Sequence, residues 1–337
     1  YGNYEPLLVF DGANGVGAKK MRNFQKRLDD VLNIEVYNEA AIGSGKLNFK
    51  CGADYVKVHQ TFPEGIPIRP NVRCVSVDGD ADRIVYFYAD DQLNFHLLDG
   101  DRIATLVASF IQDLLIVCES KLSIGIVQTA YANSASTNYI LHELKLSVAC
   151  VPTGIKHLHR KALEYDIGVY FEANGHGTIL FSKKAKSELL ETSRNEKIDK
   201  KSRSAAIKLL QLIDVINETV GDAISDMLLV ETILHARGWD LRDWEQIYHD
   251  LPCRQVKVTI QDRNCVQTTN AGRTCTKPDG LQDAIDAIVA KYRQSRAFVR
   301  PSGTENIVRV YGEAETQNDC DRMVNEIARL VYDRCNG

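Results

Sequence analysis

The sequence predicts an α/β protein with two mixed, mostly parallel three-layer α/β domains, followed by a small α+β C-terminal domain. Short apolar strand patterns alternate with helix patterns from residue 7 to residue 171, an order typical of sheets covered by helices. From Arg254 onward the pattern changes to strands with two longer helices. We therefore expect three domains, at residues 1–120, 121–250 and 251–337.

The elements of the first two predicted domains follow from hydrophobic periodicity. Leu7–Phe10 is an apolar run typical of a strand, and the apolar residues after it, from Met21 to Val31, recur at helical spacing. The further strands are expected at Val72–Val77, Ile84–Tyr88, Ile124–Val127, Ser147–Val151 and Gly168–Phe171, and the further helices at Ile103–Val117, Ser136–Leu144 and Lys156–Glu164.

The later part of the chain has two distinct patterns. The segment Lys183–Ser204 is dense in Lys, Glu and Ser, so we expect an exposed loop or a frayed helix start there, followed by helices at residues 205–219 and 222–237. In the third domain Val256, Val258 and Ile260 alternate as in a half-buried strand. Strands are also expected at Ala297–Val299 and Ile307–Tyr311, and helices at residues 281–292 and 323–331.

Composition and charge exclude several classes of protein. With 44% hydrophobic and 26% charged residues, the chain is neither disordered nor collagen-like. Its net charge of −4 provides no overall basic field, so we expect neither nucleic acid nor a membrane as partner. The nine cysteines have no zinc-site spacing, and there is no leader pattern or apolar run of about 20 residues. These features predict a cytoplasmic protein with reduced thiols.

The loop between the strands at Val72–Val77 and Ile84–Tyr88 carries the clearest chemical pattern, with Asp78, Asp80 and Asp82 at alternate positions. Three like charges this close are costly unless a cation compensates them, and carboxylate oxygens suit Mg²⁺. A helix-loop-helix calcium loop would need a Glu where Ala89 stands, and it would have helices on both sides instead of strands. A solvated acidic turn remains the alternative.

Two other loops combine polar groups. In Arg300-Pro301-Ser302-Gly303-Thr304-Glu305, followed by Arg309, a tight turn can direct backbone N–H groups, hydroxyls and a guanidinium at one phosphate. An ordinary Ser-Gly turn with surface arginines remains open.

Glu172, Asn174 and His176 follow the strand Gly168–Phe171, where a carboxylate and an amide can bind sugar hydroxyls and a histidine can move a proton. Lys156 and His157 follow another strand and could add a cation to the same pocket, although both of these loops could be plain turns.

Together the runs DGDADR, EANGH and RPSGTE resemble the metal, sugar and phosphate loops of the α-D-phosphohexomutase superfamily, in the same order. The EANGH form, TGIKHLH and GDAISDMLLVE resemble the phosphoacetylglucosamine mutase family within it. The resemblance implies interconversion of N-acetylglucosamine 6-phosphate and 1-phosphate, on the route to UDP-N-acetylglucosamine, by a protein that is a monomer at full length.

The resemblance also implies a role for each matching residue. The three aspartates would hold Mg²⁺ and Arg83 would orient a phosphate. The catalytic candidates would be Arg83, His176 and Lys156. The substrate-binding residues would be Glu172, Asn174, His157, Arg300, Ser302, Gly303, Thr304 and Arg309.

The family's first domain carries a phosphoserine in a loop of Thr-Ala-Ser-His character, which these 337 residues do not contain. We therefore expect the chain to be inactive alone. One alternative is a truncated product that binds phosphosugar or metal without catalysis. Another is a metal phosphatase with an aspartate as its nucleophile, which would not need the sugar and phosphate loops.

Overall fold

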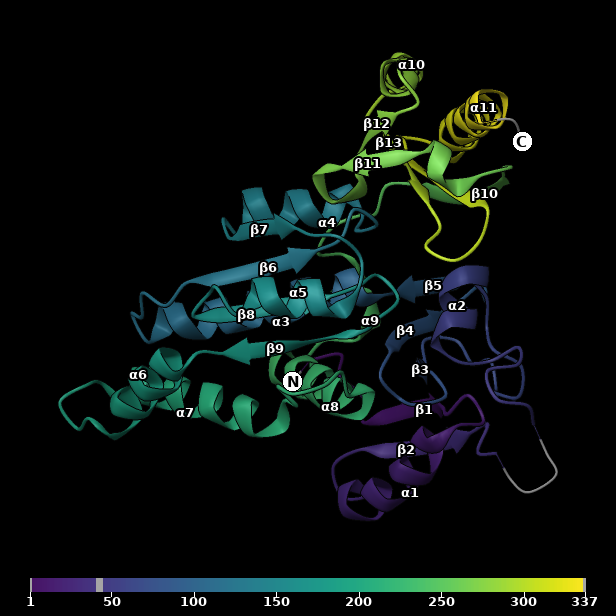
Figure 1. Ribbon diagram of the computed structural model, residues 1–337. Helices are drawn as coiled ribbons and strands as arrows, with labels where there is room; N and C mark the ends of the chain where they lie inside the picture. The colour runs from purple at the N-terminus through teal and green to yellow at the C-terminus, as the bar shows by residue number, and fades with distance from the viewer. Residues whose placement is uncertain (1, 41–44, 336–337) are drawn as a thin grey trace. The chain divides into compact units, whose positions relative to one another are not determined.

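The computed structural model describes residues 2–40 and 45–335, which form two compact units (Figure 1). The first unit consists of Tyr1–Val127, Ile140–Ala149 and Leu158–Ile247, and the second of Gln128–Tyr139, Cys150–His157 and Tyr248–Gly337. The three domain ranges expected from the sequence stay a prediction. Among the described residues, no helix combines the length and apolar character needed to cross a membrane.

The first sheet is mixed, with strand order β2-β1-β3-β4-β5. Its strands are β1 (Leu7–Asp11), β2 (Asn33–Tyr37), β3 (Arg73–Val77), β4 (Ile84–Ala89) and β5 (Phe95–Leu98). β1 pairs in parallel with β2 and β3, whereas β4 pairs antiparallel with β3 and β5. Met21 of α1 (Val16–Leu28) joins the core on one face, and Val56 of α2 (Ala53–His59) joins the core on the other. Helices therefore cover both faces, as expected for a three-layer arrangement.

The second sheet has the order β7-β6-β8-β9 and is also mixed. Its strands are β6 (Ile124–Gln128), β7 (Ser147–Cys150), β8 (Ile167–Phe171) and β9 (Gly177–Phe181). β6 and β8 are parallel, and β8 and β9 are antiparallel. The helices in this part of the chain are α3 (Gly100–Val117), α4 (Ser134–Asn138) with a π turn at Tyr139–Glu143, α5 (Ile155–Ala162), α8 (Ala223–Arg237) and α9 (Leu241–Glu245). The long helix α3 is buried along most of its length, in the same core as apolar residues of both sheets.

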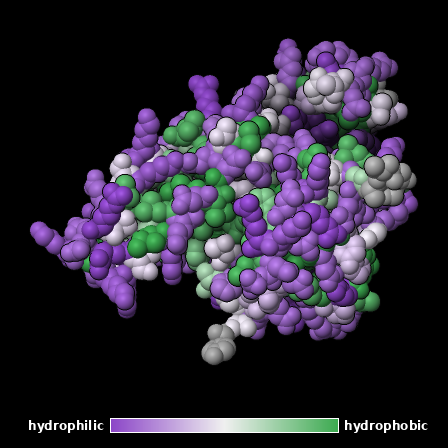
Figure 2. Space-filling model, turned by 90° about the horizontal axis from the view of Figure 1, so that it is seen from below, coloured by the Kyte–Doolittle hydropathy of each residue, from purple (hydrophilic) through white to green (hydrophobic). Residues whose placement is uncertain are grey.

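The expectation of a loop or frayed start over Lys183–Ser204 is wrong, because most of this segment is helical. It forms α6 (Lys183–Arg194) and the beginning of α7 (Lys200–Val215). The Ser182 hydroxyl accepts a hydrogen bond from the Ala185 N–H at 3.1 Å, and the Asp199 carboxylate likewise caps α7. One narrow apolar stripe, including Leu189, is buried, while most of the Lys and Glu side chains are exposed. Figure 2 shows the mostly hydrophilic surface of one face of the molecule.

The second unit holds a three-stranded antiparallel sheet of order β10-β14-β13. Its elements are β10 (Cys253–Thr259), β11 (Gln267–Thr269), β12 (Thr274–Lys277), α10 (Leu281–Val289), β13 (Arg296–Pro301), β14 (Ile307–Glu313) and α11 (Gln317–Arg334). One face of the sheet buries Val258, Val299 and Val308 against Met323 and Ile327 of α11. The two mixed α/β sheets and this small antiparallel sheet with its helices confirm the fold class expected from the sequence.

Candidate functional site

The aspartate loop, residues 78–83, connects the antiparallel strands β3 and β4 in the first unit. Asp78 Oδ1 accepts hydrogen bonds from the backbone N–H groups of Asp82 and Arg83, both at 3.0 Å. Ala81 completes the turn in the left-handed region, with φ of 61°. The loop therefore folds around one of its own carboxylates.

The three aspartates of this loop converge on one point. Each offers a carboxylate oxygen, and these oxygens lie within 4.8 Å of one another. The pKa of Asp78 is raised to about 7, chiefly by burial and in addition by the nearby carboxylates of Asp82 and Asp80. Asp82 Oδ1 is buried and has no hydrogen-bond partner within the described chain. Three hard oxygen donors, whose charge is balanced only in part by Arg83, fit a divalent cation such as Mg²⁺.

Arg83 is the cation nearest to the aspartate cluster. Its Nε lies 3.8 Å from the Asp78 carboxylate and 3.7 Å from that of Asp82, while its Nη1 donates to Asp54 Oδ2 at 2.7 Å. Arg83 therefore also forms an ion pair with a fourth acidic residue, Asp54, in the first turn of α2. The sequence analysis missed Asp54, because nothing in its local sequence signals that it lies near a loop 24 positions later.

The sugar-loop candidates lie directly against the aspartate loop. Asn174 Oδ1 accepts from the His176 N–H at 3.0 Å, and the Glu172 N–H donates to the His176 carbonyl at 2.8 Å, which closes a tight turn after β8. His176 Nε2 then lies 3.6 Å from Asp82 Oδ2. The structure therefore brings Glu172, Asn174 and His176 together with the three aspartates.

Glycines allow this close approach of the two loops. Gly175 has φ of 89°, and a Cβ atom there would lie 1.8 Å from the Ile84 carbonyl oxygen. A Cβ atom on Gly221 would lie 2.5 Å from the His176 ring, and the neighbouring Ala223 N–H donates to the Ala81 carbonyl at 2.9 Å. The GDAIS run therefore leaves space for His176 at Gly221 and bonds to the aspartate loop through Ala223, a role that the sequence analysis did not give to it.

The phosphate-loop candidates lie in the second unit, between β13 and β14. The Ser302 hydroxyl accepts from the backbone N–H groups of Thr304 at 3.3 Å and Glu305 at 3.2 Å. Gly303 has open space around it, since a Cβ atom there would meet nothing within 4 Å. The loop is thus held by Ser302 and leaves Gly303 and Thr304 exposed.

Below this loop lies a row of three cations, which we call the basic row: Lys257, Arg309 and Arg300. Arg309 of β14 is the direct register partner of both Lys257 in β10 and Arg300 in β13. Direct partners in antiparallel strands project their side chains from the same face of the sheet. None of the three forms an ion pair within the described chain, and the buried Nε of Arg309 has no hydrogen-bond partner there.

The sequence analysis identified Arg300 and Arg309 but missed Lys257. The sequence does indicate part of the position of Lys257, because the alternation of Val256, Val258 and Ile260 places it on the polar face of the strand. The register that sets it beside Arg309 could not be read from the sequence.

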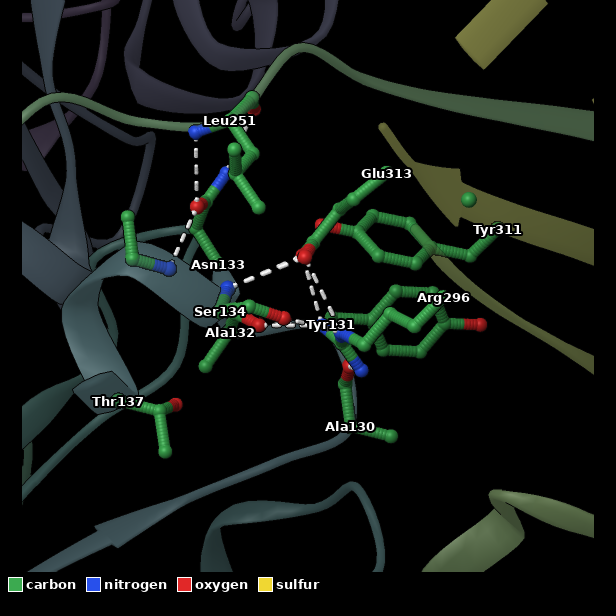
Figure 3. Close-up of polar contacts among 12 residues, drawn as sticks. Ala130, Tyr131, Ala132, Asn133, Ser134, Thr137, Leu251, Arg296, Tyr311 and Glu313 are labelled. Atoms are coloured by element: carbon green, nitrogen blue, oxygen red, sulfur yellow. Dashed lines mark hydrogen bonds and ion pairs between the residues drawn. The ribbon is translucent and has the colours of Figure 1, made fainter. Parts of the chain in front are cut away.

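Four register pairs away on the same sheet face, a different cation has hydrogen-bond partners for its whole guanidinium group (Figure 3). Arg296 Nη2 donates to Glu313 Oε1 at 2.7 Å, and the Tyr311 hydroxyl donates to the same oxygen at 2.8 Å. The Ser134 N–H also donates to Glu313, and Arg296 Nη1 donates to the Ala130 carbonyl at 2.9 Å. This network, which we call the buried pair, fixes residues 130–134 on the sheet.

Lys156 and His157 are exposed residues in the first turn of α5 and belong to the second unit. Glu172, Asn174 and His176 belong to the first. A common pocket for these residues therefore stays a prediction.

Three family models match successive parts of the chain. Residues 4–85 match domain II of phosphoacetylglucosamine mutase AMG1, residues 99–239 match its domain III, and residues 265–330 match the C-terminal domain of phosphoglucomutase/phosphomannomutase.

Full-length relatives and solved structures agree with these matches. The human phosphoacetylglucosamine mutase is 49% identical over 334 residues, which cover 99% of this chain and 61% of the human protein. The pig protein is likewise 49% identical, over 336 residues. The crystal structure of Aspergillus fumigatus N-acetylphosphoglucosamine mutase with GlcNAc-6P and magnesium has a TM-score of 0.92 and 47% identity, over 98% of this chain and 66% of that one. The chain thus spans about 61% of the length of these curated relatives.

Proposed function

The chain belongs to the phosphoacetylglucosamine mutase family, and from this premise we propose that it supplies the metal-, sugar- and phosphate-binding groups for interconverting N-acetylglucosamine 6-phosphate and 1-phosphate. The observation that carries the proposal is the contact between the aspartate cluster and the sugar loop, with His176 Nε2 3.6 Å from Asp82. That contact would bring a sugar held by the loop close to a cation held by the aspartates.

In this proposal Asp78, Asp80 and Asp82 hold Mg²⁺, which when bound neutralises charge on a transferring phosphoryl group. Arg83 lies beside the cluster and orients the same phosphate with the part of its charge that Asp54 leaves free. Support for Mg²⁺ comes from the donor set of this chain and from the magnesium in the Aspergillus relative.

The remaining residues hold the substrate. Glu172 and Asn174 bind sugar hydroxyls, and the Asn174 carbonyl oxygen is already used within its own turn, so its amide N–H₂ is the group that we assign to the sugar. His176, with Lys156 or His157, exchanges protons with the substrate. Arg300, Ser302, Gly303, Thr304 and Arg309 bind the phosphate that does not react. The reaction needs one phosphate to be anchored while the other is transferred.

Phosphoryl transfer also needs a group that gives and receives the phosphoryl. The family's Thr-Ala-Ser-His loop is not among these 337 residues, and positioning without a nucleophile does not catalyse transfer. We therefore propose that these residues bind phosphosugar and Mg²⁺ but do not interconvert the two phosphates unless a serine-bearing domain is supplied.

A coupled assay for N-acetylglucosamine 1-phosphate tests this function. With Mg²⁺ and a hexose bisphosphate primer, the 337-residue chain alone should show no turnover, whereas the same chain joined to a serine-bearing first domain should be active. In the joined protein Asp80→Asn should lower kcat at least ~100-fold, because the metal's charge stabilisation is worth several kcal/mol.

The matched control is Asp91→Asn, in the exposed turn between β4 and β5, which should leave kcat unchanged. Turnover by the 337-residue chain alone would show that a nucleophile lies within it. Undiminished turnover of Asp80→Asn would refute the metal assignment.

A further inference from the structure

The face of the C-terminal sheet opposite α11 carries more positive charge than the phosphate loop motif accounts for. Arg300 and Arg309 belong to that motif, but Lys257 lies on β10, more than 40 residues earlier in the chain. The register makes Lys257 the direct partner of Arg309, on the side opposite Arg300. Since neighbouring strands lie about 5 Å apart, the basic row spans about 10 Å, with Arg309 at its centre.

The row lies at the loop end of the sheet. Arg300 and Arg309 pair one rung before Pro301 and Val308, and the Ser302 N–H donates to the Ile307 carbonyl at 2.9 Å just beyond. Ile307 is in turn the register partner of Thr259, two residues along β10 from Lys257. Lys257 is therefore as near to the strand end that carries the phosphate loop as Arg309 is.

Neighbouring groups leave the charge of the row unbalanced. Like charges on directly opposed positions repel each other, and the three cations have no acidic partner within the described chain. Arg309 contributes a second observation, because its buried Nε donates no hydrogen bond there. Elsewhere on the same strands, Arg254 is paired with Asp321 at 3.2 Å and Arg296 with Glu313. Among the basic residues of these three strands, only those of the basic row lack an acidic partner within the described chain.

We propose that Lys257 is a further phosphate-binding residue, which contacts the anchored phosphate monoester from the β10 side while Arg300 and Arg309 contact it from the β13 and β14 side. The inference rests on the proposed function, since it adds a residue to the same anchoring site. A phosphate monoester carries up to two negative charges over three oxygens, so it can accept from two guanidinium forks and an ammonium at once. A neutral sugar cannot be held in this way.

Calorimetric titration of N-acetylglucosamine 6-phosphate into the 337-residue chain tests the inference. Lys257→Met should weaken binding roughly 10-fold, the lower end of what a charged hydrogen bond contributes, because the side chain is exposed. Lys257→Arg keeps the charge and should bind within about 3-fold of wild type. Binding of N-acetylglucosamine, which has no phosphate, should be the same in all variants.

The matched control is Arg254→Met, which removes one positive charge from the same strand but from the face that carries the Asp321 ion pair. It should leave the affinity within about 2-fold of wild type, because exposed charges are screened by salt. An equal loss in Lys257→Met and Arg254→Met would mean a general charge effect and would overturn the inference.

Arg300→Ala separates this inference from the function on which it rests. Weaker binding in Arg300→Ala with unchanged binding in Lys257→Met would overturn the role of Lys257 and leave the anchoring site intact. Unchanged binding in both variants, or no binding by wild type, would overturn the anchoring site itself. Circular dichroism and an unchanged thermal midpoint establish that each variant is folded.

Discussion

Two rungs of the same sheet face differ in how they balance charge. On the buried pair, Arg296 meets Glu313, which also accepts from the Tyr311 hydroxyl and the Ser134 backbone (Figure 3). In the basic row, Arg309 is the register partner of both Arg300 and Lys257, and none of the three is acidic. The rungs share two strands and one face, but they differ in side-chain chemistry and in surroundings, since residues 130–134 cover the buried pair and Lys257 of the basic row is exposed.

From this difference we infer a structural role for the buried pair and propose a ligand site at the basic row. A buried charge with a hydrogen-bonded partner stabilises a defined packing, here of residues 130–134 on the sheet. Like charges on opposed positions cost roughly 0.2 to 1 kcal/mol, a cost that a bound anion removes. The aspartate loop shows the same principle with the opposite sign, since Asp78, Asp80 and Asp82 have one nearby cation, Arg83.

The largest effect on stability is expected at the buried pair. Glu313→Gln removes the counter-charge of the Arg296 guanidinium, which is 31% exposed and keeps its hydrogen bonds to the Ala130 and Ala132 carbonyls, so the loss should be about 1.5 to 3 kcal/mol. Hydrogen exchange of β13 and β14 amides in the native protein should report this loss. Glu315→Gln, two residues along at an exposed position, should change it by less than about 0.5 kcal/mol. Equal protection in the two variants would show that the pair is not structural.

A substitution in the basic row should lower the affinity for ligand and leave the stability of the sheet unchanged. Arg300→Ala removes a charge-assisted contact worth roughly 1.5 to 3 kcal/mol, so affinity for N-acetylglucosamine 6-phosphate should fall about 10- to 100-fold. Exchange protection of β13 should be nearly unchanged, because Arg300 has no partner to lose within the described chain. Titration with N-acetylglucosamine is the control, and an equal loss for both ligands would indicate misfolding instead.

Much of the fold was predictable because hydrophobic periods decide it. The strand of Val256, Val258 and Ile260 and the helix through Met323 lie where their patterns placed them. The wrong prediction for Lys183–Ser204 has a physical cause, since a helix that buries only a narrow apolar stripe has nearly the same composition as an exposed, charged loop. Strands β2, β5 and β9 were also missed, although they are as long as strands that were expected, such as β1 and β7.

The candidate site was predictable only as separate loops. Asp78, Asp80 and Asp82 are close in sequence, so their convergence follows from one turn. Asp54, Gly221 and Lys257 reach their loops through tertiary contacts and strand register, which local sequence does not specify.

The smallest expected effect is a gain of stability in the unliganded basic row. Arg309→Glu places an acid between Lys257 and Arg300, so the row acquires the alternating charges of the buried pair. Exchange protection of β14 should rise by about 0.2 to 1 kcal/mol, the usual range for a cross-strand ion pair at a partly exposed position. Arg309→Gln is the control, and it should give about half of this gain. A fall in protection would mean that Arg309 already has a structural partner.

Calorimetric titration of N-acetylglucosamine 6-phosphate into Arg309→Glu is the most direct test of the claim that the unbalanced charge of the basic row makes it a phosphate site. The account predicts no measurable binding to this folded, slightly stabilised variant, because an internal carboxylate now occupies the place of the phosphate and repels it. Binding as tight as that of the wild-type chain would contradict the account, and it would mean that the anchored phosphate lies elsewhere.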